Sequence, residues 1–284
     1  MTNLKKELAL MIPSVIFFTV NILSVVFVSA FLTEVFTPAA QATVYAPQFL
    51  WDKKQLVICT VKNRRSTKRR FEITHPSGRV NELSETEIRR VKSIVNQEFT
   101  PQKTGIHFIG WNACQDTENP DVIFAKLKNP PSFFSKGLKS SGTSSIARSD
   151  IVFEKSTASV ISLASFEKSV ILHEFSHMAG LVHEENHEAF LENDVFSDPN
   201  CLRFFNRLFP ENVDIDVRSP QFKKRVLGRL PEAKILGREF QQRSMGGYDS
   251  LSIANRCNLL GRDTLDGNLS LSPGDRRALK RLYP

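Results

Sequence analysis

Three histidines in the middle of the chain have the type and the spacing that a metal ion requires. His173 and His177 stand four residues apart, so on a helix their imidazole rings project from one face and can converge on a single cation. Gly180 can adopt the left-handed conformation that ends a helix, which lets the chain turn back. We expect this turn to bring His183 to the same point as a third ligand.

Glu174 directly follows the first histidine and is placed beside the ion without being needed as a ligand. There its carboxylate can take a proton from a water molecule that the metal activates. Three neutral imidazoles leave one tetrahedral position open, as in catalytic rather than structural zinc sites. Because the ligands are imidazoles, Zn²⁺ is favoured over calcium or magnesium. These residues therefore predict a catalytic Zn²⁺ site with Glu174 as the general base.

Strands that could support this site are predicted from short apolar and β-branched runs. They fall at residues 55–61, 71–74, 106–111, 121–127 and 150–154. A stretch rich in serine, glycine, proline and lysine at 129–149 indicates a surface loop, and residues 188–243 indicate short helical or irregular pieces. The order strand, helix, strand, strand predicts a mixed sheet.

Three helices begin at recognisable capping signals. Ser84 can cap a first helix while Glu87 reaches back to it, and apolar residues recur at helical spacing through about Phe99. Ser165 can cap the helix that carries the histidines. Ser272 opens a last helix, followed by proline at the first helical position and an acid in the first turn.

The run from His173 to His183 resembles the zinc-binding pattern of the metzincin metallopeptidases. An H-E-x-x-H string alone is only moderately specific. With 13 glycines and 6 histidines in 284 residues, the added glycine and third histidine make a chance match about a thousandfold rarer. Trp51–Leu56 resembles the opening of matrixin catalytic domains, and Glu184 resembles the residue that follows the third histidine in astacins. Leu271–Asp275, with Leu282-Tyr283, resembles the closing helix of both families.

This resemblance implies an α/β (α+β) fold over residues 43–284. The expected architecture is a metzincin-like zincin domain with a mixed twisted sheet, a long first helix, the zinc-binding helix and an irregular C-terminal lobe that ends in a helix. The active-site cleft would lie between the lobes. Residues 150–154 would form the edge strand that receives an extended peptide through backbone pairing.

The resemblance also shows where this chain departs from the family. Tyr248–Cys257 resembles the astacin-type Met-turn, in which a methionine packs beneath the histidines, but Ala254 stands at the methionine position. Arg256 stands where astacins have a tyrosine near the zinc. Arg256 either stabilises the oxyanion or is an ordinary exposed arginine, and we favour the second interpretation. Met245 is an alternative Met-turn candidate that the alignment disfavours.

The first 42 residues have the character of an export segment. Lys5 and Lys6 precede a nearly uninterrupted apolar stretch from Leu8 to Leu32. Its length fits either a signal peptide or an N-terminal membrane anchor, and the small-x-small pattern Ala40-Gln41-Ala42 favours cleavage near Thr43. Both interpretations place residues 43–284 outside the cytosol, in a secreted or periplasmic (extracytoplasmic) location.

The four cysteines all follow this segment, and an even number in an exported chain favours disulfides. Three pairings are possible. We prefer Cys59 with Cys114 and Cys201 with Cys257, because each bond would then join one side of the expected active-site cleft. A cysteine zinc site is disfavoured because no two cysteines have C-x-x-C spacing.

The formal net charge of +8 would draw the protein toward anionic envelope surfaces. The densest basic cluster, residues 62–70, predicts a solvated turn between strands. We expect no nucleic-acid partner, because export separates the chain from chromosomal DNA. The remaining histidines, His75, His107 and His187, lack ligand spacing and are expected at the surface or in the core with satisfied ring nitrogens.

Together these features predict an exported, zinc-dependent endopeptidase that hydrolyses protein or peptide substrates and meets a membrane only through an uncleaved N-terminal segment. One alternative is a catalytically impaired zinc-binding module of the cell envelope, with the altered Met-turn as its cause. Another is an envelope-anchored structural or adhesion protein whose basic surface is the functional part.

Overall fold

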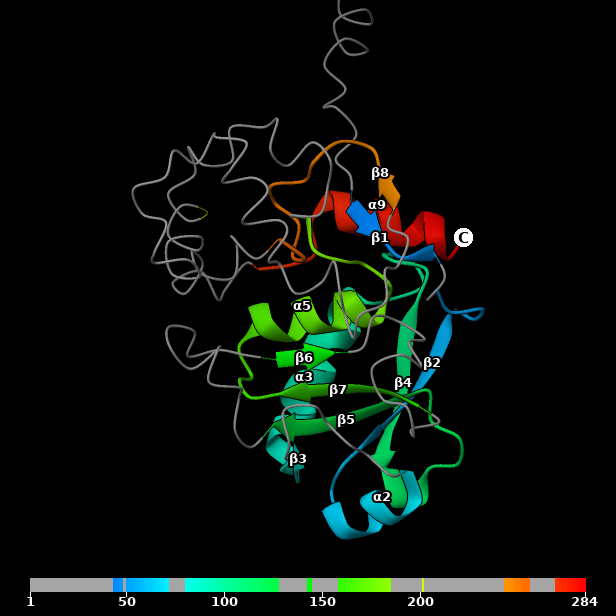
Figure 1. Ribbon diagram of the computed structural model, residues 1–284, viewed down its shortest axis with the longest axis vertical. Helices are drawn as coiled ribbons and strands as arrows, with labels where there is room; N and C mark the ends of the chain where they lie inside the picture. Colours follow the sequence, from blue (N-terminus) through cyan, green and yellow to red (C-terminus); the bar gives the residue numbers. More distant parts are fainter. Residues whose placement is uncertain are drawn as a thin grey trace, which may run out of the picture. The chain divides into compact units, whose positions relative to one another are not determined.

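The computed structural model describes residues 43–47, 50–71, 80–127, 142–144, 158–184, 201, 243–255 and 269–284 (Figure 1). These residues belong to one compact unit, residues 41–284. The predicted export segment lies outside the described residues, as does nearly all of the predicted irregular stretch 188–243. Within the described ranges, no helix has the length and apolar character needed to cross a bilayer.

A mixed six-stranded sheet forms the centre of the unit. Its main path runs in the order β4 (His107–Ala113), β2 (Gln55–Thr60), β5 (Val122–Leu127), β7 (Ser159–Leu163) and β6 (Gly142–Ser144), and β3 (Val80–Asn81) also pairs with β5. The pairs from β4 to β7 are parallel, whereas β6 and β3 pair antiparallel with their neighbours. The predicted combination of helices with a mixed sheet is therefore confirmed at this level.

The strands on one side of the sheet differ from the predicted ones. β6 falls inside the predicted loop 129–149, so that prediction is wrong at Gly142–Ser144. β6 stands at the end of the described strand order, beside β7. The sequence patterns did not predict a strand at β7 (Ser159–Leu163). The predicted edge strand at 150–154 lies outside the described residues.

A bulge in β4 turns one aromatic side chain into the core. Gly110 and Trp111 both have positive φ, 89° and 69°, and Trp111 is skipped in the pairing of β4 with β2. Glycine is required at 110 because a Cβ there would lie 2.8 Å from the carbonyl oxygen of Ile58. The bulge leaves Trp111 buried and stacked on Phe175 of the histidine helix.

The predicted capping box at Ser84 and the predicted capping serine at Ser272 are both confirmed. In α3 (Glu85–Glu98) the Ser84 hydroxyl accepts from the Glu87 amide while the Glu87 carboxylate accepts from the Ser84 amide. In α9 (Pro273–Leu282) Ser272 and Asp275 make the same reciprocal pair. Local sequence therefore determines where both helices begin.

The predicted cap of the histidine helix is wrong by two residues. α5 (Lys168–Met178) has Glu167 as its N-cap, and no side chain caps that end. Ser165 instead accepts a hydrogen bond from the Glu167 amide, just before the helix. The predicted buried face of α5 is confirmed, since Val170, Ile171 and Phe175 are all buried.

The basic cluster 62–70 is mostly helical, which corrects the prediction of a turn. α2 (Arg64–Phe71) begins after Asn63, whose side-chain oxygen accepts from the Ser66 amide. Arginine and lysine have high helix propensity, and the absence of an apolar stripe concealed the helix. Phe71 ends α2 and so does not begin the predicted strand 71–74, whose other residues lie outside the described ones.

The core is divided between the two faces of the sheet. One cluster joins the inward residues of β2, β5 and β7 to α3 and α5, and a second contains the alternate residues of the same strands together with Cys59 and Cys114. These cysteines form the predicted disulfide. The bond lies on the face opposite α5, so the expectation that it joins one side of the cleft is wrong. Cys201 is disulfide-bonded, and its predicted partner Cys257 lies outside the described residues.

A separate two-stranded ribbon lies near the last helix. β1 (Thr43–Tyr45) pairs antiparallel with β8 (Arg243–Met245), and β1 contacts α9 (Figure 1). Met245 pairs with Thr43 at the end of this ribbon. The two ends of the described chain thus meet beside the segment that follows α5.

Candidate metal centre

The three predicted ligands converge. The Nε2 atom of His173 lies 3.0 Å from that of His177 and 3.0 Å from that of His183, and the last two lie 2.9 Å apart. All three side chains are buried. This cluster could hold a metal ion, with each histidine offering one nitrogen.

The hydrogen bonds on the far side of two rings determine which nitrogen carries the proton. The Nδ1 atoms of His173 and His177 lie 2.8 and 2.7 Å from the carbonyl oxygens of Ile253 and Leu181. A carbonyl can only accept, so the Nδ1 atoms of His173 and His177 each carry a proton, and in the neutral form of these rings Nε2 carries the lone pair. These Nε2 atoms meet that of His183 in a buried place where a metal ion could lie between them.

The end of α5 turns the chain so that the third histidine reaches the first two. Gly180 has φ of 98°, its amide donates to the His177 carbonyl, and the Leu181 amide donates to the Ser176 carbonyl. This is a Schellman ending with glycine in the left-handed position. The predicted role of Gly180 is confirmed, and His183 follows three residues later.

The segment after this turn is held by the N-terminal ribbon. The Val182 amide donates to the Val44 carbonyl at 2.9 Å, and Tyr45 forms an isolated antiparallel bridge with Leu181. Glu184 is fully buried, and its carboxylate accepts from the Val44 amide at 3.3 Å and from the Asp249 amide at 3.3 Å. The backbone before His183 and the side chain of Glu184 after it are therefore both tied to other parts of the fold.

Two distant aromatic side chains complete the C-terminal end of α5. The last carbonyls of a helix have no partner within it. Here the Trp51 indole donates to the Met178 carbonyl at 2.8 Å, and the Tyr283 hydroxyl donates to the Ala179 carbonyl at 3.0 Å. Burial raises the pKa of Tyr283, so its hydroxyl keeps the proton it donates. The sequence resemblance included Trp51 and Tyr283 but gave no indication of this function.

Phe175 fastens the opposite side of α5 to the core. Its ring lies among four buried aromatic rings, and the shortest centroid distance is 5.0 Å, to Phe108. The other three rings belong to Phe99, Trp111 and Phe124. Edge-to-face and stacked contacts of this kind fix a helix more firmly than area burial alone. The helix that carries two ligands is thus rigidly seated.

The turn beneath the site is the one that the sequence alignment favoured. Ile253, whose carbonyl meets His173, precedes Ala254, and both are completely or almost completely buried. Met245 lies in the β1–β8 ribbon, so the alternative Met-turn is not the turn that contacts the histidines. Arg256 lies outside the described residues, and its two interpretations stay open.

Glu174 occupies α5 between the two helical ligands and is 7 % exposed. His107 lies in β4, and its Nδ1 is buried without a hydrogen-bond partner in the described ranges, so the expectation of satisfied ring nitrogens is wrong there. His75 and His187 lie outside the described residues. Of the described histidines, only the three ligands come together.

Comparison with known proteins does not assign the chain to a family. No protein-family model matches it, and no curated protein matches it.

Proposed function

We propose that the protein is an exported, zinc-dependent endopeptidase of the metzincin type, with His173, His177 and His183 as ligands. The observation that carries this proposal is the convergence of three buried Nε2 atoms, with the Nδ1 atoms of His173 and His177 held by backbone carbonyls. Tetrahedral zinc with bonds of about 2.0 to 2.1 Å holds ligand nitrogens about 3.3 Å apart. The distances of 2.9 to 3.0 Å require only a few tenths of an ångström of adjustment.

Glu174 supplies the acid–base chemistry in this proposal. A zinc ion bound by the three histidines would polarise the scissile carbonyl and lower the pKa of the attacking water. Glu174 accepts the proton of that water and then delivers a proton to the leaving amine. Its position on α5, one residue from His173, and its burial support this role, because a buried carboxylate transfers protons without competition from bulk solvent.

A peptide substrate is supported by the sheet beside the site. β6 stands at the end of the described strand order and contacts α5, so an extended chain added to it would run near the histidines. Strand addition uses backbone hydrogen bonds for affinity. An extracytoplasmic location is compatible with the Cys59–Cys114 disulfide, because such bonds persist in oxidising compartments.

One observation favours a second candidate, a zinc-binding module of the envelope with impaired turnover. The turn beneath His173 carries Ala254 where the resembling peptidases have a methionine. This change alters the packing below the ligands without removing any of them. Retention of Glu174 favours the peptidase, since a purely structural metal site has no use for a general base.

Chelation and metal replacement separate the candidates. Purified residues 43–284 would be incubated with a varied peptide library, before and after metal removal by a chelator, and again after addition of Zn²⁺, Ca²⁺ or Mg²⁺. The peptidase predicts cleavage that disappears with the chelator and returns with Zn²⁺ only. Zinc binding without cleavage of any library peptide would support the binding module instead.

A further inference from the structure

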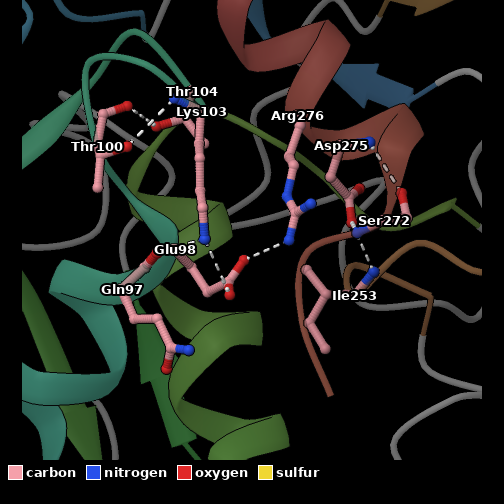
Figure 2. Close-up of polar contacts among 9 residues, drawn as sticks. All are labelled: Gln97, Glu98, Thr100, Lys103, Thr104, Ile253, Ser272, Asp275 and Arg276. Atoms are coloured by element: carbon pink, nitrogen blue, oxygen red, sulfur yellow. Dashed lines mark hydrogen bonds and ion pairs between the residues drawn. The ribbon is translucent and has the colours of Figure 1, made fainter. Parts of the chain in front are cut away.

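Asp275, in the first turn of α9, is fully buried and accepts hydrogen bonds from outside its own helix. Its Oδ2 accepts from the Ser272 amide at 3.0 Å, which is the helix cap, and from the Ile253 amide at 2.9 Å. Its Oδ1 accepts from the Ser252 hydroxyl at 2.7 Å. Figure 2 shows this carboxylate between Ser272 and Ile253.

Helix capping alone does not explain this arrangement. The same reciprocal box begins α3, but there Ser84 and Glu87 form it in exposed surroundings. At α9 the carboxylate is buried, and burial raises its pKa although the hydrogen bonds from Ile253 and Ser252 favour the ionised form. Burying a carboxylate is costly, and a capping box does not require it. The two additional bonds to the turn are what distinguish Asp275.

Those bonds lead to the metal centre. The Ile253 amide donates to Asp275, and the Ile253 carbonyl accepts from Nδ1 of His173, so both backbone polar groups of this residue are hydrogen-bonded. The turn is tightened further because the Ser252 hydroxyl, held by Asp275, accepts from the Ala254 amide at 3.0 Å. Moving the carboxylate would therefore change the direction of the carbonyl that orients His173.

A second path leads from the same helix end toward His183. The Ser272 hydroxyl donates to Oδ2 of Asp249 at 2.6 Å, and the Asp249 amide donates to Glu184. Glu184 directly follows His183 in the chain. The N-terminus of α9 thus contacts the turn below one ligand and, through Asp249, the residue beside another.

We propose that Asp275 is a positioning residue of the metal centre, which aims the Ile253 carbonyl at His173 and so keeps the Nε2 lone pair directed at the ion. The inference rests on the proposed metal binding by the three histidines. Hydrogen-bond partners of ligating histidines raise ligand basicity and fix ring orientation, and their loss typically weakens metal affinity. In this chain the turn is held by a carboxylate from the last helix.

The test compares three variants that separate the contacts of the Asp275 side chain from a general loosening of α9. Asp275→Ala removes all three acceptor contacts. Asp275→Asn keeps an oxygen that can accept from the Ile253 and Ser272 amides, and its NH₂ group can donate a hydrogen bond to the Ser252 hydroxyl oxygen. Arg276→Ala is the matched control. Arg276 is adjacent on α9 and pairs with buried Glu98 at 2.8 Å, so its loss loosens the helix without touching the turn (Figure 2).

Zinc affinity would be measured by competition with a chromophoric chelator, and ligand geometry by the visible absorption of the Co²⁺-substituted protein. We expect Asp275→Ala to bind zinc about 10- to 100-fold more weakly with an altered Co²⁺ spectrum. Arg276→Ala and Asp275→Asn are expected to stay within about threefold of wild type. Equal weakening in Arg276→Ala, or wild-type affinity in folded Asp275→Ala, would overturn the inference. Failure of the wild-type protein to bind zinc would refute the proposed function itself.

Amide hydrogen exchange in the wild-type protein provides a test that does not depend on a variant folding. Coupling between sites is reciprocal, so zinc binding must strengthen the bond from the Ile253 amide to Asp275. We expect exchange of the Ile253 amide to slow when Zn²⁺ is added, while the Phe99 amide, bonded to Val95 at the end of α3, stays unchanged. An Ile253 amide indifferent to zinc would overturn the role of Asp275.

Discussion

Nδ1 of His173 lies 2.8 Å from the carbonyl oxygen of Ile253, the residue that precedes the buried Ala254. The contact connects the first predicted ligand to a turn in which Ala254 stands where the resemblance leads us to expect a methionine. It depends on a backbone group, which no substitution at 254 removes. The ligand geometry and the packing of the turn can therefore be tested separately.

Ala254→Met tests the packing. Ala254 is fully buried in the cluster that includes α5, so added methionine atoms must displace neighbours rather than fill open space. We expect a loss of about 1 to 3 kcal/mol in the free energy of unfolding, with zinc affinity unchanged. Urea unfolding of the zinc-loaded protein measures this loss. A more stable variant would show that the turn encloses a cavity of methionine size.

Each ligand should be essential for metal binding. Alanine at 173, 177 or 183 removes one of three nitrogens that lie within 3.0 Å of each other. We expect zinc affinity to fall more than about 100-fold, beyond the loss typical of outer partners. His107→Ala is the matched control, because His107 lies in β4 and belongs to no ligand cluster in the described ranges. Loss of zinc in that control as well would indicate general unfolding.

The disulfide should stabilise the fold without affecting the site. Cys59 and Cys114 are buried on the face of the sheet opposite α5. Replacing both by alanine should lower the free energy of unfolding by about 2 to 4 kcal/mol, because the unfolded chain gains conformational freedom. Calorimetry and zinc titration of the same sample check the two parts of this prediction. A parallel loss of zinc affinity would contradict the placement of the bond.

Asp249 gives a pH dependence of known sign. Burial raises the pKa of its carboxyl, and the hydrogen bonds from Ser272 and Leu251 only partly offset this. The folded state then binds the proton more tightly than the unfolded state, so this group's contribution to stability is present below its unfolded pKa of about 3.9 and is lost as pH rises through the folded value.

Asp249→Asn cannot ionise, so it removes the loss of stability that ionisation of Asp249 causes, while it keeps similar contacts. The stability of the variant relative to wild type should therefore rise as pH increases from about 4 toward neutrality. Urea unfolding at several pH values measures the difference, in which the other carboxyl groups cancel. A difference that stays constant or falls with pH would show that Asp249 does not have a raised pKa.

The sequence predicted those parts of the site that depend on local spacing. Their spacing of four residues predicts that His173 and His177 lie on one face of a helix, and Gly180 predicts the left-handed turn that ends it. The boxes at Ser84 and Ser272 are likewise local, since each joins residues three apart. The Cys59–Cys114 disulfide was predicted correctly, but the reason given for it was wrong.

The sequence could not show contacts between residues far apart in the chain. Trp51 and Tyr283 satisfy carbonyls at the end of α5, and Asp275 holds the turn below His173. None of these roles has a periodic or short-range signal. The basic helix α2 was also missed, because its polar composition lacks the apolar stripe by which helices are recognised. Tertiary contacts decide such features.

We propose that the histidine cluster and Glu174 together hydrolyse peptides. The most direct test compares single-turnover cleavage of one library-selected peptide by the wild type and by Glu174→Gln, at equal zinc content. We predict that Glu174→Gln retains zinc but cleaves about 10²- to 10⁴-fold more slowly, as expected for loss of a general base. Equal cleavage rates in the two proteins would show that Glu174 is not the general base.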